Sequence, residues 1–102
     1  MTSSVIAARL KQARTALGIS QRELGIRAGI DEFVASARIN QYERGKHVPD
    51  FATMERLAEV LGVPTPYFYT RDELLAELIL GLGKLPASAV QEMLQLMAGQ
   101  AR

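Results

Sequence analysis

The chain contains no cysteine and only one histidine among its 102 residues. The absence of cysteine excludes disulfides and thiolate metal sites, and a single histidine without a cluster of carboxylates around it does not make a metal centre. The same scarcity leaves no nucleophile beside a base and no convergent pair of carboxylates, which catalysis would need. We therefore expect a protein that binds no cofactor and is not an enzyme.

Long apolar runs are also missing. The longest leucine-rich stretch, residues 74–85, is interrupted by Glu77, two glycines and Lys84, and it is shorter than the roughly 20 apolar residues that a bilayer requires. The first residues, MTSSVIAARLKQAR, lack the basic start, apolar centre and cleavage site of a secretory signal. These absences predict a soluble, cytoplasmic protein that does not enter a membrane.

The composition suits one modest core, with 48% hydrophobic and 23% charged residues. The charge is uneven along the chain. Residues 1–50 carry eight Lys or Arg against five Asp or Glu, whereas residues 51–102 carry four against six. A basic first half suits a phosphate-bearing partner, and an acidic second half is expected to face elsewhere.

The stretches between glycine and proline carry helical spacing, and no sustained alternation of apolar and polar residues indicates a strand. The sequence therefore predicts an all-α fold. The first helix ends at Gly18 and has one apolar stripe with basic side chains around its sides. The stripe comprises Ile6, Leu10, Ala13 and Leu17, and the basic residues are Arg9, Lys11 and Arg14.

Capping residues predict where two further helices begin. Ser20 and Glu23 form an S-x-x-E capping box for a helix over about 21–28, after which Gly29 can take positive φ. Asp50 is expected to cap the second of these helices. The buried stripe predicted for that helix comprises Phe51, Met54, Leu57, Ala58 and Leu61.

Three helical segments are expected in the rest of the chain. Pro66 indicates a short helical turn over 65–69. Thr70 with Glu73 forms another capping box, before a leucine-rich helix, and a last helix follows Pro86.

The segment from Gly18 to Pro49, GISQRELGIRAGIDEFVASARINQYERGKHVP, resembles the lambda-repressor/Cro-like (XRE) helix-turn-helix family. The resemblance rests on the glycine and capping serine before Gln21, the Ala-Gly pair that ends at Gly29, and INQYERGKHVP at residues 39–49. It implies a compact lambda-repressor-like helical bundle over residues 1–69. The two further helices that the spacing predicts over residues 70–102 then form a C-terminal extension.

The spacing departs from the family pattern. Ala28 to Gly45 spans 18 residues, which is about four more than the family's usual count, and such an addition costs little extra loop-closure entropy. We interpret residues 31–34 as a stretched turn between the two motif helices. Phe33 or Val34 is expected to pack beneath the second helix and fix its angle.

The second motif helix is expected to run from about Ala35 to Arg44 and to bury Ile39 and Tyr42. The resemblance implies that its exposed residues read base edges in the major groove. Guanine offers two acceptors that suit Arg, and adenine offers a donor and an acceptor that suit Asn or Gln, so Arg38 and Gln41 are the leading candidates. The full set is Ser36, Ala37, Arg38, Asn40 and Gln41.

Other residues are expected to contact phosphate or to support the motif. The resemblance implies that Gln21 bonds a backbone phosphate and braces the reading helix, and a helix N-terminus favours an anion there. The same role is implied for three residues after the reading helix, namely Arg44, Lys46 and His47. Arg14 and Glu43 match positions that form a structural ion pair in relatives.

The two C-terminal helices carry apolar side chains on more than one face. Either they wrap the N-terminal bundle or they meet the same segment of a second chain. We favour dimerisation, because one reading helix covers half of a typical operator and a twofold dimer presents two, about 34 Å apart. The predicted interface comprises Leu74, Leu75, Leu78, Ile79, Leu82, Met93 and Met97.

The leading functional hypothesis is a sequence-specific regulator of transcription, a repressor in the first instance, that binds double-stranded operator DNA as a homodimer at a pseudo-palindromic site. One alternative is an antitoxin, whose C-terminal segment also holds a toxin partner. The other is a helical protein–protein interaction module.

Overall fold

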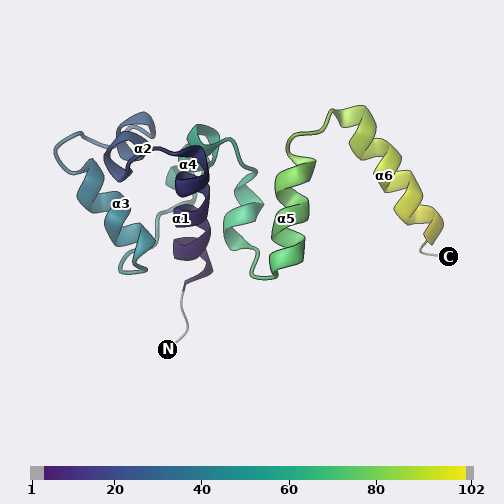
Figure 1. Cartoon of the computed structure of the whole chain (residues 1–102), viewed down its shortest axis with the longest axis horizontal. Helices are drawn as coiled ribbons and strands as arrows, with labels where there is room; N and C mark the ends of the chain where they lie inside the picture. The colour runs from purple at the N-terminus through teal and green to yellow at the C-terminus, as the bar shows by residue number, and fades with distance from the viewer. Residues whose placement is uncertain (1–3, 101–102) are drawn as a thin grey trace.

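The structure is a computed structural model that describes residues 4–100. Over this range all regular secondary structure is helical, as the sequence predicts (Figure 1). The elements are α1 (Val5–Leu17), α2 (Gln21–Arg27), α3 (Ala35–Glu43), α4 (Phe51–Leu61), the 3-10 helix η1 (Thr65–Tyr69), α5 (Glu73–Leu82) and α6 (Ala87–Gln100). The outer ends of the two predicted domains, residues 1–3 and 101–102, lie outside the described residues.

Short polar side chains begin α2 and α4 at the positions that the sequence indicates. Ser20 Oγ accepts a 3.0 Å hydrogen bond from the Glu23 amide, and Asp50 Oδ1 accepts one of 2.8 Å from the Thr53 amide. Each bond satisfies an amide that has no partner within its own helix. At the end of α1, Gly18 takes a φ of 80° and turns the chain.

The predicted cap of α5 is wrong by two residues. The Thr70 hydroxyl donates to the Pro66 carbonyl oxygen at 2.7 Å, and therefore completes η1 instead of starting the next helix. Asp72 is the cap, because its carboxylate accepts a 2.8 Å hydrogen bond from the Leu75 amide.

One core joins the first four helices and η1. Helices of this length are marginal in isolation, so packing around the core must hold them in place. Gly25 of α2 lies so close to α3 that a Cβ added there would be 2.7 Å from the Ala35 Cβ. The fully buried large side chains are Leu10, Leu24, Ile39, Met54, Leu57 and Phe68.

Three side chains differ from the predicted stripes. Leu17 is 45% exposed and Phe51 is 61% exposed, because the first lies at the last residue of its helix and the second at the first residue, where each helix passes the edge of the core. Arg9, predicted at the side of α1, is only 3% exposed. Its guanidinium carbon lies 5.5 Å from the centre of the Tyr67 ring, and its Nε donates a hydrogen bond to the Thr70 carbonyl oxygen directly after η1.

Of the two C-terminal helices, α5 lies beside η1 and α6 extends away from the bundle (Figure 1). Ala76 of α5 is buried, and Ile79 and Leu80 pack partly against the core, whereas α6 has no buried residue. The longest dimension is 53 Å and the radius of gyration is 15.5 Å, compared with about 13 Å for a compact domain of this size. The helical extension therefore leaves apolar surface uncovered in the single chain.

Candidate nucleic-acid interface

The turn between α2 and α3 is an ordered structure held by its own hydrogen bonds. Gly29 has a φ of 89°, and the Ile30 amide donates to the Gly25 carbonyl oxygen at 2.9 Å. Asp31 then accepts from two amides, its carboxylate from Phe33 at 2.8 Å and its carbonyl oxygen from Val34 at 3.0 Å. The stretch therefore forms a defined turn directly before α3.

The expected role of the turn residues is wrong. Phe33 is 90% exposed and Val34 is 41% exposed, so neither packs beneath α3. Gly25 and Ala35 instead approach so closely that no side chain could be added at Gly25 without a shift of α3. The contact between these two small residues determines where α3 lies against α2.

The reading helix has a clear division between its faces. Ala35, Ile39 and Tyr42 are buried in the bundle. The five predicted base-reading residues lie on the remaining surface, where Ser36, Ala37 and Arg38 are exposed and Asn40 and Gln41 are half-buried.

Gln21 braces the reading helix from the start of α2. Its side-chain Nε2 donates to Asn40 Oδ1 at 3.3 Å and to Glu43 Oε1 at 3.1 Å. Asn40 is consequently oriented by a neighbour, which distinguishes it from a freely solvated helix residue. The amide of Gln21 thereby connects the N-terminal end of α2 to the second half of α3.

Arg14 and Glu43 join α1 to the reading helix by a bidentate ion pair. The guanidinium donates from Nε to Glu43 Oε2 at 2.5 Å and from Nη2 to Glu43 Oε1 at 3.0 Å. Arg14 Nη1 also donates to the Ile19 carbonyl oxygen at 3.0 Å. The hydrogen bond that Arg14 donates to Glu43 raises the pKa of Arg14 above its usual value. Glu43 is thus the shared acceptor for α1 and α2.

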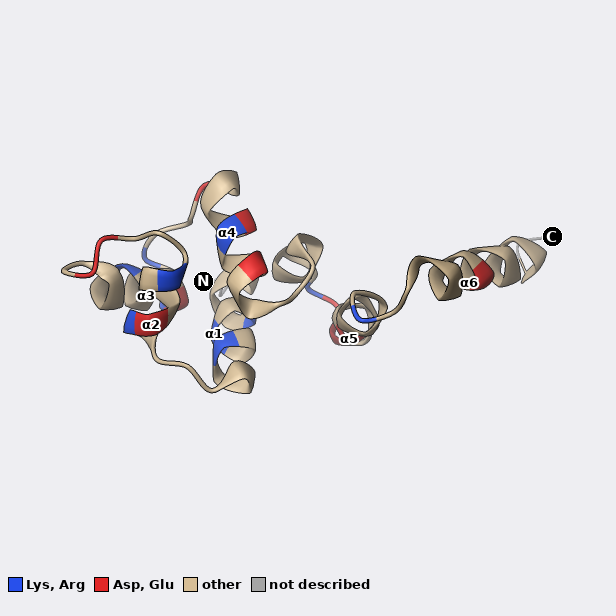
Figure 2. Ribbon diagram, turned by 90° about the horizontal axis from the view of Figure 1, so that it is seen from above, with Lys and Arg blue, Asp and Glu red and all other residues tan. Residues whose placement is uncertain are grey.

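The cationic side chains near α3 are of two kinds. Arg44, Lys46 and His47 are exposed just after α3, and Arg38 is exposed on α3 itself. On α2, Arg22 pairs with Glu32 of the turn at 3.3 Å and Arg27 pairs with Glu23. The described residues of α6, by contrast, contain no Lys or Arg (Figure 2). Around the reading helix, the basic groups available to an anionic partner are therefore Arg38 and the three residues after α3, while Lys11, Arg71 and Lys84 are exposed elsewhere.

Two side chains lie in surroundings that the sequence did not predict. The position of Arg9 beside the apolar stripe of α1 does not indicate that it is buried. Its burial depends on hydrogen bonds to the carbonyl oxygens of Thr70 and Arg71, which are distant in the sequence. Phe33 carried a signal, since it is a large apolar residue that directly follows two acidic residues in a turn.

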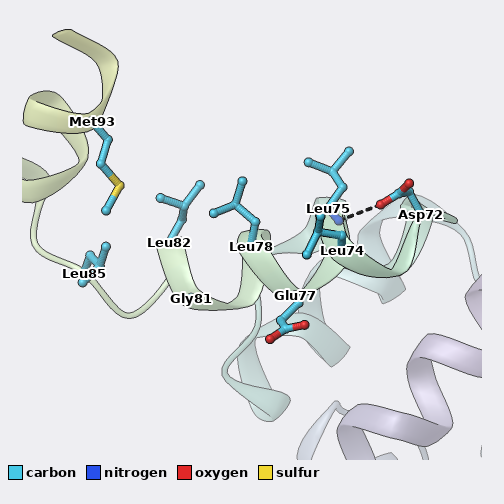
Figure 3. Close-up of a pocket in the computed structure, with 9 residues that line it drawn as sticks. All are labelled: Asp72, Leu74, Leu75, Glu77, Leu78, Gly81, Leu82, Leu85 and Met93. Atoms are coloured by element: carbon cyan, nitrogen blue, oxygen red, sulfur yellow. Dashed lines mark hydrogen bonds between the residues drawn. The ribbon is translucent and has the colours of Figure 1, made fainter. Parts of the chain in front are cut away.

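An open apolar groove runs along the C-terminal helices (Figure 3). Its volume is about 770 Å³. Ile79, predicted at the dimer interface, does not line this groove and instead packs partly against the core of its own chain. Met97 is exposed on α6 beyond the groove. The apolar lining residues are Leu74, Leu75, Leu78, Leu82, Leu85 and Met93.

The geometry of residues 4–100 meets the requirements of neither a metal site nor a membrane span. In this part of the chain no three His, Asp or Glu side chains gather as metal ligands would. No helix within the same range has the length and apolar character to cross a membrane.

Comparison with known proteins covers most of the chain. A family model described as helix-turn-helix matches residues 10–68, from within α1 through most of η1. The crystal structure of the transcriptional regulator BswR superposes with a TM-score of 0.84 at 46% sequence identity, covering 91% of this chain and 92% of BswR. No match was found among curated protein sequences.

The two similarities extend over different lengths. Because the BswR alignment covers 91% of the chain, it must continue past the family match into the C-terminal helices. The bundle geometry, the Gly29 turn and the bracing of α3 agree with the family match, so the chain belongs to the lambda-repressor/Cro-like (XRE) helix-turn-helix family of DNA-binding transcriptional regulators.

Proposed function

We propose that the chain is a sequence-specific transcriptional repressor that binds a pseudo-palindromic operator as a homodimer. Residues 1–69 would bind DNA and residues 70–102 would pair with a second chain. The chain itself performs no catalysis. The observation that carries the proposal is the surface of α3, where polar and cationic side chains stand on a helix braced from both α1 and α2.

Rigid bracing matters for base recognition because a hydrogen bond to a base edge depends on position to a fraction of an ångström. Arg38 and Gln41 are the proposed readers of guanine and adenine, with Ser36, Ala37 and Asn40 beside them. Gln21, Arg44, Lys46 and His47 are the proposed phosphate contacts, which set the register without reading sequence.

The apolar groove supports the dimer. A monomeric protein seldom leaves a continuous apolar surface of this kind in water, and twofold pairing would cover it. Repression is the simplest outcome of such binding, because a dimer on an operator excludes other proteins from the same DNA. A toxin could occupy the same groove, which would make the chain an antitoxin.

Selection from a randomised duplex pool tests the proposal. The purified full chain is incubated with the pool, and bound duplexes are sequenced over several rounds. The mass of the protein in solution is measured separately by light scattering. We expect a dimer and enrichment of an inverted repeat, with half-sites about 10 base pairs apart.

Two other results would count against the proposal. A folded dimer that enriches no sequence would favour the protein-interaction module. A monomer that enriches a single half-site would retain DNA binding but remove the homodimer, and the groove would then belong to another partner.

A further inference from the structure

Phe33 is a large aromatic side chain that the fold holds in water. It is 90% exposed, yet its amide donates a 2.8 Å hydrogen bond to the Asp31 carboxylate, so the backbone that carries it is fixed. Large apolar residues are usually withdrawn from water, because burying such a side chain stabilises a protein.

The neighbours of Phe33 each have a structural role. Ile30 packs partly against the core, Asp31 closes the turn, and Glu32 pairs with Arg22 of α2 at 3.3 Å. Phe33 itself contributes little to this packing. The turn therefore holds the ring in an exposed position, and the ring itself does not stabilise the turn.

The position of the ring relates it to the reading helix. Phe33 precedes Ala35, the first residue of α3, by two positions, and Ser36 and Ala37 begin the exposed surface at the same end. In helix-turn-helix proteins the N-terminal residues of the second helix contact base edges in the major groove. The turn therefore lies next to the end of α3 that enters the groove.

The chemistry of the turn restricts what Phe33 can contact on DNA. Asp31 and Glu32 directly precede it and are negatively charged, so the segment is unsuited to the phosphate backbone. The apolar group that a duplex exposes in the major groove is the 5-methyl of thymine, which accepts contact from side chains such as Phe. We propose that Phe33 reads a thymine 5-methyl group at the edge of each half-site. This inference rests on the proposed DNA-binding function.

The test combines a protein variant with the removal of one methyl group from the DNA. Phe33→Ala is taken through the same duplex selection as the wild type. Each thymine of the wild-type half-site is then replaced in turn by uracil, which lacks only the 5-methyl group, and affinities of both proteins are measured. Tyr69→Ala is the control, because Tyr69 is also exposed but belongs to η1.

At one thymine per half-site, uracil should weaken wild-type binding about fourfold, the value of one buried methyl group, and should leave Phe33→Ala unchanged. The variant should also lose the thymine preference there, whereas Tyr69→Ala should keep it. If the wild type enriches a site and Phe33→Ala enriches the same site with equal response to uracil, this inference is overturned while DNA binding stands. If the wild type enriches nothing, the proposed function itself fails.

Discussion

Arg9 Nε donates a 2.9 Å hydrogen bond to the carbonyl oxygen of Thr70, 61 residues farther along the chain. Its Nη2 donates to the Arg71 carbonyl oxygen at 3.0 Å, and its Nη1 lies 3.1 Å from a carboxylate oxygen of Glu73. One buried guanidinium on α1 therefore fixes the start of α5 against the DNA-binding bundle. If the dimer forms through α5, this group also sets how the two bundles are oriented.

Arg9→Met is expected to lower the free energy of unfolding by about 3 kcal/mol, since hydrogen bonds to charged groups contribute about 1.5 to 3 kcal/mol each and the carbonyl acceptors lose their donor. Urea denaturation measures the change. Lys11→Met, at an exposed position of the same helix, should change it by less than about 0.5 kcal/mol. Equal effects of the two substitutions would contradict the assigned role of Arg9.

The Arg14–Glu43 pair should show strong coupling in a double-mutant cycle. Arg14→Met or Glu43→Gln alone leaves a largely buried partner without its counter-charge, which is expected to cost about 3 kcal/mol. The double variant should cost clearly less than the sum of the two. Additive losses, measured by urea denaturation, would mean that the two side chains act independently.

The residues of the reading helix and of the following segment should respond differently to substitution. Arg38→Ala or Gln41→Ala is expected to cost about 1 to 3 kcal/mol of binding free energy and to relax preference at particular base pairs. Lys46→Ala should weaken all sequences alike and reduce the salt slope by about one. Duplex binding at several salt concentrations separates these cases, and an unchanged preference in Arg38→Ala would refute the proposed register of α3.

A charge in the apolar groove should disrupt pairing. Leu78→Glu places a carboxylate among groove residues, so burying it at an interface would be unfavourable and the dimer should dissociate at concentrations where the wild type stays paired. Sedimentation measures the mass of each protein. Val48→Glu, exposed before α4, should remain dimeric, and a dimeric Leu78→Glu would locate the interface elsewhere.

Tyr67 makes stability depend on pH in the alkaline range. Burial raises the pKa of this phenol above its usual value, although nearby Arg9 acts in the opposite direction. A raised pKa in the folded state means that its stabilising contribution is complete below about pH 10, the unfolded value, and is lost as pH rises through the folded value. Urea denaturation at rising pH should therefore show a steeper decline for the wild type than for Tyr67→Phe, and parallel declines would contradict this.

Local signals in the sequence determined the helices and the type of motif. Caps such as Ser20 and Asp50 act over three or four residues, and apolar spacing follows from the period of the helix, so both can be recognised in the sequence alone. The same holds for Gly29, which can take a positive φ because glycine has no Cβ.

Only the tertiary structure decided which side chains of different helices contact one another. Arg9 is buried because its hydrogen-bonding partners come from a segment 61 and 62 residues away, and Gln21 orients Asn40 because α2 and α3 cross at a close contact between two small residues. Phe33 remains in water, with 90% of its surface exposed, because no other element of the described chain packs over the turn that carries it. Spacing within one helix carries no information about such contacts, since they depend on how separate elements pack together.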